Sequence, residues 1–205
     1  LGRVVRETVG RGGRVLIPAF AVGRTQEILY NLHQLTLAGE IPRVPIVIDS
    51  PLASEATAVF RENTSIFDSS EPMVRSHDRN RAAIFDFDLV QFTPGVEDSK
   101  AMMRRPGPMI VIAASGMVEA GRILHHLVHS AGDPRSTILI VGFQAEHTLG
   151  RRIVERRETI KVFGEEIPLR AQVEVITGYS AHADRTGLQE WLGAARASSP
   201  QLRDV

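Results

Sequence analysis

The residues best suited to chemistry lie between Gly178 and Asp184, where a hydroxyl, an imidazole and a carboxylate occur at short spacing. Ser180, His182 and Asp184 follow the apolar segment 173–176, which predicts a strand. Strand ends commonly display reactive side chains. Because a histidine can protonate a leaving oxygen near neutral pH, we predict that His182 is catalytic and that Ser180 orients its ring or binds substrate.

The alternative interpretation of this run is structural. His182 would then be an ordinary histidine at the start of a helix. In either interpretation, Asp184 is placed to cap that helix. In that helix the apolar residues occur at helical spacing, and we expect them to pack inward: Leu188, Trp191 and Leu192.

Metal-ligand residues are sparse. The chain has no cysteine, so thiolate metal sites and disulfides are excluded. His125 and His129 share one face of a predicted helix, with His126 between them, but two ligands do not complete a zinc site. We therefore predict no metal site in this chain. The isolated histidines are predicted to be ordinary: His33, His77 and His147.

The elements that must position these residues follow a repeated order. Four short apolar runs predict strands, at 14–20, 45–50, 109–113 and 137–141. Each precedes a predicted helix, starting at about 24, 52, 119 and 147. Apolar strands that alternate with helices indicate a parallel sheet covered on both faces. We predict an α/β fold, a Rossmann-like three-layer domain with a mainly parallel sheet.

Smaller elements decorate this core. A helix is predicted over 4–9, a charged helix over 71–81 and a strand over 89–92. The segment 159–170 predicts an antiparallel hairpin with its turn at Gly164.

Small and polar clusters follow the predicted strands, and ligands of open α/β sheets bind outside the strands' carboxyl ends. We therefore expect one shared cleft, formed by the clusters 21–24, 49–51, 114–116, 142–144 and 178–182. The turn at 115–117 precedes a predicted helix, whose free N–H groups favour a phosphate oxygen. Arg24 and Arg122 lie in the first turns of helices, where a cation needs an anion or carboxylate nearby, and Glu27 is an alternative partner for Arg24. The predicted substrate-binding residues are Arg24, Ser50, Ser115, Gly116, Met117 and Ser180.

Each cluster taken alone has a simpler explanation, because glycine and serine at strand ends mostly serve turns and helix caps. The formal net charge is zero, so no global field attracts nucleic acid or anionic membrane. No apolar run approaches about 18 residues, and no signal-like segment is present. We expect no membrane association and a cytoplasmic location.

Several of these segments, in collinear order, resemble the beta-CASP region of the metallo-β-lactamase superfamily. The matching stretches are Gly12–Glu27, Asp49–Ala53, Ala114–Met117, Val141–Gln144 and Ser180–Asp184. The family includes the endonuclease subunit of the cleavage and polyadenylation specificity factor, its bacterial and archaeal relatives and, more distantly, ribonuclease J.

The resemblance implies a zinc-dependent parent enzyme that hydrolyses RNA phosphodiester bonds. Two zinc ions in the metallo-β-lactamase domain would activate a hydroxide and stabilise the reacting oxygens. The beta-CASP domain would be an RNA-clamping lid. His182 matches the family's motif B histidine, which is thought to assist the scissile phosphate or leaving group. The implied partners are single-stranded RNA and the metallo-β-lactamase domain of the same chain, and a homodimer is left open.

The family's HxHxDH zinc motif and its motif C histidine are absent from these 205 residues. We therefore expect a piece of a longer protein that by itself holds no zinc pair and cleaves no RNA. The predicted organisation has the end of the preceding domain or a lead-in helix at 1–10, the beta-CASP domain at 11–176, and the motif B turn with a returning helix at 177–205.

Three alternatives remain open at this point. The parent could be a non-catalytic RNA-binding scaffold of the same family or a DNA-processing member. An unrelated nucleotide-binding domain is disfavoured because no GxGxxG or GxxxxGK[ST] motif follows a strand. Endonuclease and exonuclease action are both compatible with the sequence.

Overall fold

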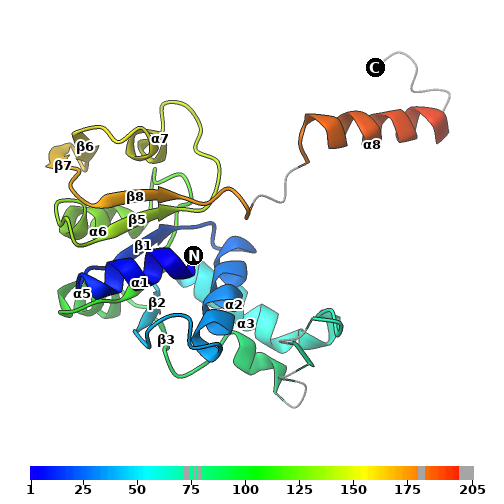
Figure 1. Cartoon of the computed structure of the whole chain (residues 1–205), viewed down its shortest axis with the longest axis horizontal. Helices are drawn as coiled ribbons and strands as arrows, with labels where there is room; N and C mark the ends of the chain where they lie inside the picture. Colours follow the sequence, from blue (N-terminus) through cyan, green and yellow to red (C-terminus); the bar gives the residue numbers. More distant parts are fainter. Residues whose placement is uncertain (72–73, 76, 78–79, 180–182, 199–205) are drawn as a thin grey trace.

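A six-stranded parallel sheet forms the centre of the computed structural model, which describes residues 1–71, 74–75, 77, 80–179 and 183–198 (Figure 1). The spatial order of its strands is β3-β2-β4-β1-β5-β8. The strands are β1 Val15–Pro18, β2 Ile46–Ile48, β3 Val90–Phe92, β4 Ile110–Ala113, β5 Thr137–Ile140 and β8 Gln172–Val175. This arrangement confirms the predicted α/β fold, including the strand predicted over 89–92.

Strand β1 lies between β4 and β5, and its residue Val15 is in register with Ile110 on one side and Thr137 on the other. The residues of β1, β2, β4 and β5 are all buried. Because these strands are covered on both faces, their sequences are apolar runs rather than alternating patterns. The parallel register places the carboxyl ends of β1, β4 and β5 beside one another.

Alternate side chains of the sheet belong to two cores. On one face Ile17 joins a core with Leu29, and on the other Leu16 joins a core with Leu127. The first core is covered by α1 Gly2–Gly10, α2 Arg24–Leu37 and α3 Pro51–Glu62. The second is covered by α5 Val96–Arg104, α6 Ile123–Ser130 and α7 Leu149–Val154. The result is the expected three-layer arrangement (Figure 1).

A separate hairpin extends the second face. Strands β6 Thr159–Val162 and β7 Glu165–Pro168 pair antiparallel, and Ile160 and Val162 are buried in the second core. The turn residues Phe163 and Gly164 have φ angles of 51° and 86°, which suits a tight two-residue hairpin turn. The hairpin predicted at 159–170 with its turn at Gly164 is confirmed.

Two helix predictions need correction. The helix predicted from 119 begins at Ile123, because residues 115–122 form a loop. The charged helix predicted over 71–81 is confirmed in part, because Val74 and Arg75 are helical, while several of its residues lie outside the described ones. At its end, Arg81–Ile84 form the short 3₁₀ helix η2 instead. A second 3₁₀ helix, η1, covers Thr64–Ile66.

Helix α8, Arg185–Ser198, lies apart from the sheet domain in Figure 1. None of its residues is buried, and Trp191 is 70% exposed. The prediction that Leu188, Trp191 and Leu192 pack inward is therefore wrong for the chain as described. Both faces of the sheet are covered by the other helices. No helix in the described ranges is long and apolar enough to cross a bilayer.

Candidate functional site

A cleft of about 840 Å³ opens at the carboxyl ends of β1, β4 and β5. Three predicted clusters supply most of its lining: the β1 end, the loop after β4 and the β5 end. Asp184 and Ala183 line it as well. The lining residues are Pro18, Ala19, Phe20, Val22, Arg24, Gly116, Met117, Val141, Gly142, Phe143, Ala183 and Asp184.

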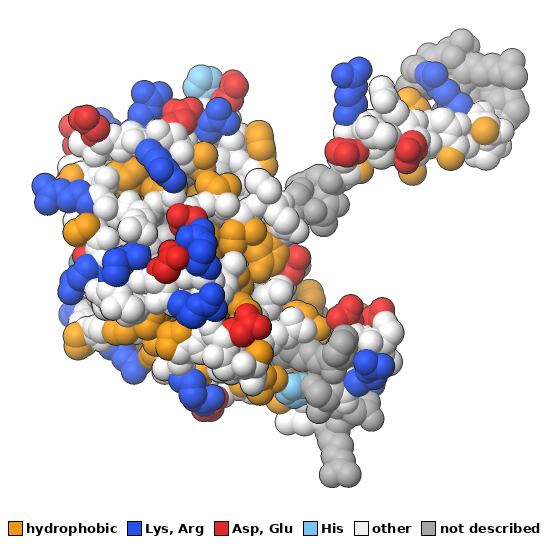
Figure 2. Space-filling view, in the orientation of Figure 1, with side chains coloured by type: hydrophobic (Ala, Val, Ile, Leu, Met, Phe, Trp, Pro, Cys, Tyr) orange, Lys and Arg blue, Asp and Glu red, His pale blue; other side chains and the backbone are white. Residues whose placement is uncertain are grey.

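The walls of this cleft are mainly apolar, and several of its side chains face solvent. Phe143 is 73% exposed, Val22 60% and Phe20 53%. Figure 2 shows hydrophobic side chains gathered on the side of the sheet domain from which the chain leaves toward α8. Exposed aromatic side chains in a hollow are typical of a binding surface.

The loop after β4 is held by its own hydrogen bonds. The hydroxyl oxygen of Ser115 accepts from the backbone N–H groups of Glu119 and Ala120, at 3.1 and 3.3 Å. Val118 has a φ of 62°, a left-handed conformation that costs about 1–3 kcal/mol for a β-branched residue. Its side chain is fully buried, and burial worth about 1.5–3 kcal/mol offsets that strain.

This loop changes the expected phosphate site. Because α6 begins at Ile123, the turn at 115–117 does not lie at a helix N-terminus. The Ser115 hydroxyl already caps the loop. Gly116 and Met117 do line the cleft, so a ligand there would meet them through van der Waals contact with the cleft wall. It would not meet them through the free N–H groups of a helix N-terminus.

Gln144 ties the loops around the cleft together. Its side-chain amide is buried and donates to the carbonyl oxygens of Gly116 and Phe143, at 2.9 and 3.0 Å. A Cβ on Gly150 would lie 1.7 Å from the Gln144 Oε1 atom, so only glycine fits there beside this side chain. The cleft walls at Gly116 and Phe143 are therefore held in one fixed arrangement.

Arg24 pairs with a carboxylate of its own helix. The guanidinium Nη1 donates to the Glu27 carboxylate at 2.6 Å, and its carbon lies 5.6 Å from the centre of the Tyr179 ring. Of the two partners considered for Arg24, a phosphate and Glu27, the carboxylate of Glu27 is the one that it contacts here. Burial raises the pKa of the Tyr179 hydroxyl, which keeps it neutral beside this ion pair.

Ser50 is not among the residues that line the cleft. Its buried hydroxyl caps α3 by accepting from the Ala53 N–H at 3.2 Å. Pro51 occupies the first position of the helix, as is common after a capping serine. The geometry therefore gives Ser50 a structural role at this end of β2.

Asp49 is the centre of a buried polar cluster that sequence reasoning did not identify. Its carboxylate accepts from the Thr93, Ser99, Arg122 and His126 side chains, at 2.6–2.8 Å. Burial alone would raise the pKa of Asp49, but these hydrogen bonds outweigh it and hold the pKa far below its usual range. The signal in the sequence was an aspartate ending a fully apolar strand, because a buried carboxylate requires donors.

The histidine run does not form a metal site. His126 is fully buried against Asp49, whereas the exposed His125 lies 4.7 Å from the Phe163 ring, centre to centre. Across the described ranges, no group of three or more histidine, aspartate or glutamate side chains could hold a metal ion. His33 is also buried, stacked 3.9 Å from the Phe87 ring, and burial lowers the pKa of its imidazole.

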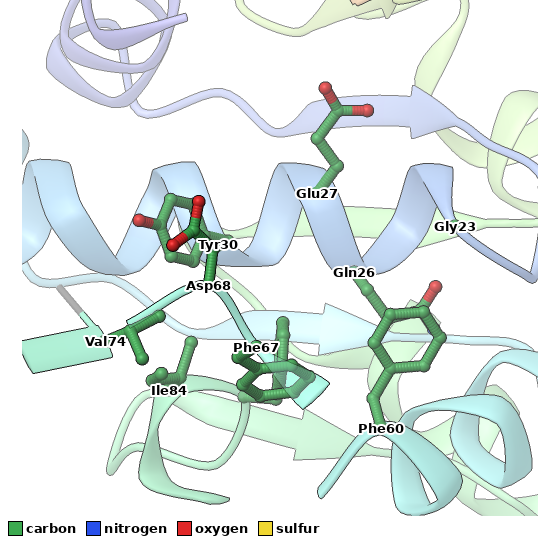
Figure 3. Close-up of a pocket in the computed structure, with 10 residues that line it drawn as sticks. Gly23, Gln26, Glu27, Tyr30, Phe60, Phe67, Asp68, Val74 and Ile84 are labelled. Atoms are coloured by element: carbon green, nitrogen blue, oxygen red, sulfur yellow. The ribbon is translucent and has the colours of Figure 1, made fainter. Parts of the chain in front are cut away.

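A second hollow, of about 290 Å³, lies beside α2 and is lined mainly by apolar side chains (Figure 3). Phe60, Phe67 and Ile84 form part of its wall, and Glu27 points away from them in Figure 3. It contains none of the predicted site residues. Gly23 borders this hollow, and its neighbours Val22 and Arg24 line the larger cleft.

Ser180 and His182 lie outside the described residues, but both flanks of their run are described. Tyr179 contacts Arg24, and Asp184 lines the cleft. Asp184 also accepts from the Gly187 N–H at 2.8 Å, which confirms the prediction that it caps the following helix.

Comparison with known proteins gives two family matches. The Beta-Casp domain matches residues 25–153, and the Zn-dependent metallo-hydrolase RNA specificity domain matches residues 166–199. The chain is 41% identical over 189 residues to a ribonuclease from Thermus thermophilus, covering 92% of this chain and 43% of that protein.

Two archaeal relatives cover the chain to a similar extent. An RNase J-like protein from Methanocaldococcus jannaschii is 34% identical, over 92% of this chain and 42% of its own length. A transcription termination factor from Methanosarcina mazei is 32% identical, over 94% of this chain and 30% of its own length. The chain thus spans less than half the length of these three relatives.

Proposed function

Because this chain belongs to the beta-CASP family of metallo-β-lactamase RNA nucleases, we propose that it is the RNA-clamping lid of a longer zinc-dependent ribonuclease. That enzyme would hydrolyse RNA phosphodiester bonds in RNA processing or decay, in the cytoplasm. The observation that carries the proposal is the cleft at the carboxyl ends of β1, β4 and β5, beside the run that contains His182.

The role proposed for His182 rests on the flanks of its run. Tyr179 on one side packs on Arg24, which lines the cleft, and Asp184 on the other side lines the cleft itself. An imidazole there would hold or deliver a proton at the leaving oxygen of a phosphodiester. Ser180 would orient that ring or bind the substrate.

Zinc would be held elsewhere in the longer protein. The described residues supply no metal cluster, and the sequence contains no HxHxDH motif. When bound, a zinc pair supplies an activated hydroxide and charge stabilisation at the reacting phosphate. The lid would contribute substrate contacts and His182, and alone it would hold no stoichiometric zinc and cleave no RNA.

Helix α8 is the segment best suited to meet the rest of that protein. Leu188, Trp191 and Leu192 are 57%, 70% and 39% exposed and lie at helical spacing. An amphipathic helix with an exposed apolar face packs against another apolar surface. We propose the metallo-β-lactamase domain of the same protein as that surface, with residues 177–205 forming the return from the lid.

The experiment compares this chain with the longer protein. We expect zinc and RNA cleavage in the longer protein and neither in the chain alone, as measured by metal analysis and cleavage of a labelled single-stranded RNA. In the longer protein, His182→Ala should lower turnover by about 10² or more with zinc content unchanged. Unchanged turnover would remove His182 from the mechanism.

The same comparison decides between the alternatives. An intact longer protein that binds RNA but neither holds zinc nor cleaves would be a non-catalytic scaffold. A protein that cleaves single-stranded DNA in preference to RNA would be a DNA-processing member of the family.

A further inference from the structure

The cleft has few charges with which to hold phosphates. Among the described residues that line it, Arg24 and Asp184 are charged. Arg24 is already paired with Glu27 at 2.6 Å, and Asp184 carries the same sign as a phosphate. An RNA backbone would therefore find little compensation on these walls, whereas uncharged, flat groups would find apolar surface.

From this composition we propose that Phe143 and Phe20 form a stacking platform for the bases of single-stranded RNA. The proposal rests on the RNA-clamping function proposed above and specifies how RNA is recognised in the same cleft. Base faces stack on aromatic side chains, and every base has such a face. The platform would therefore select unpaired RNA with little sequence preference.

Phe143 combines an exposed ring with a fixed backbone. Its side chain is 73% exposed, although its carbonyl oxygen accepts from the buried Gln144 amide at 3.0 Å. The same amide donates to the Gly116 carbonyl oxygen across the cleft wall. A ring held out from an anchored loop loses little conformational freedom on binding, which favours a recognition role.

Phe20 is held in a similar way from the end of β1. Its carbonyl oxygen accepts from the Thr25 hydroxyl at 2.8 Å. A Cβ on Gly116 would lie 3.1 Å from its ring, so the ring packs closely against that glycine. With 53% of the residue still exposed, part of its surface remains available to a base.

Binding of the chain to a labelled single-stranded RNA, measured by fluorescence anisotropy at constant salt, tests the platform. We expect Phe143→Ala to weaken binding by about tenfold and Phe143→Trp to restore it. Phe163→Ala removes another exposed ring, 58% exposed, from the β6–β7 turn outside the cleft and should leave binding unchanged. Thermal melting verifies that each variant is folded.

An oligonucleotide that lacks its bases provides the second arm. The unsubstituted chain should bind the base-containing RNA about tenfold more tightly than the abasic form, and Phe143→Ala should reduce that ratio. A duplex of the same sequence should bind more weakly, because pairing hides the base faces. Tight RNA binding that is equal for abasic RNA and unaffected by Phe143→Ala would overturn the platform alone. No RNA binding by the unsubstituted chain would overturn the clamping role itself.

Discussion

Asp49 and His126 are both fully buried, and the His126 Nε2 atom lies 2.6 Å from the Asp49 carboxylate. The two residues come from different elements, the end of β2 and the middle of α6, so their contact joins the sheet to the helix that covers it. The Arg122 guanidinium donates to the other carboxylate oxygen at 2.8 Å. This pair fixes one end of the sheet next to the loop that carries Gly116 and Met117.

Asp49→Asn should destabilise the fold strongly. The amide cannot accept four hydrogen bonds in the same geometry, and it leaves the half-buried Arg122 and the buried His126 with incomplete partners. Removing one partner of a buried charge cluster typically costs about 3–5 kcal/mol. Urea unfolding measures the loss, with Glu55→Gln as an exposed carboxylate control on α3. A loss as small as that of the control would show that the cluster adds nothing to stability.

The stability of the fold should depend on pH in two separate ranges, one set by His33 and one by Asp49. His33 is buried, and its lowered pKa means that the unfolded chain binds a proton more readily than the folded chain. Its contribution is complete above the unfolded value near 6.5 and is lost as the pH falls through the folded value. The pKa of Asp49 is lowered too, so its contribution is lost only below the unfolded value of about 3.9.

Replacing His33 should therefore weaken the pH dependence of stability near neutral pH and leave the acidic range, set by Asp49, unchanged. His33→Gln removes the titrating ring that stacks on Phe87 and lies near His77 and Asp88. We expect the free energy of unfolding to fall less steeply between about pH 7 and pH 5 than in the unsubstituted chain. An unchanged slope, measured by urea unfolding at each pH, would show that another group governs this range.

The sheet was predictable because its evidence is local. Each buried strand is a short apolar run, and the strand-end clusters converge by topology, which placed Phe143 and Gly116 in one cleft. The Asp49 cluster was not predictable, because its donors lie 44 to 77 residues away along the chain. The start of α6 was predicted too early, because the apolar residues near 119 already have helical spacing. The Ser115 hydroxyl and the positive φ of Val118 stabilise a loop there instead.

Gly150→Ala should disturb the cleft through Gln144, whose side chain packs against this glycine of α7. The added Cβ would lie 1.7 Å from Gln144 Oε1 and 2.9 Å from the Met117 carbonyl oxygen, so the Gln144 side chain must move. Overpacking of this kind costs about 1–3 kcal/mol. It should also release Phe143 and weaken RNA binding. Gly142→Ala is the matched control, since its Cβ would meet nothing within 4 Å. Equal melting temperatures for the two variants would contradict this account of Gln144.

Ser50→Ala distinguishes the two roles considered for this residue. As the cap of α3 it accepts from Ala53 N–H, and loss of such a cap costs ~1 kcal/mol. Because Ser50 lies outside the lining of the cleft, RNA affinity should be unchanged. Ser50→Thr keeps a capping hydroxyl and should recover most of the stability that Ser50→Ala loses. Ser50→Asp also keeps a capping oxygen but adds a charge at a buried position, so it should recover only part of that stability. Unfolding and anisotropy measured on the same preparations separate stability from binding. A drop in RNA affinity in Ser50→Ala with stability retained would return Ser50 to the substrate-binding residues.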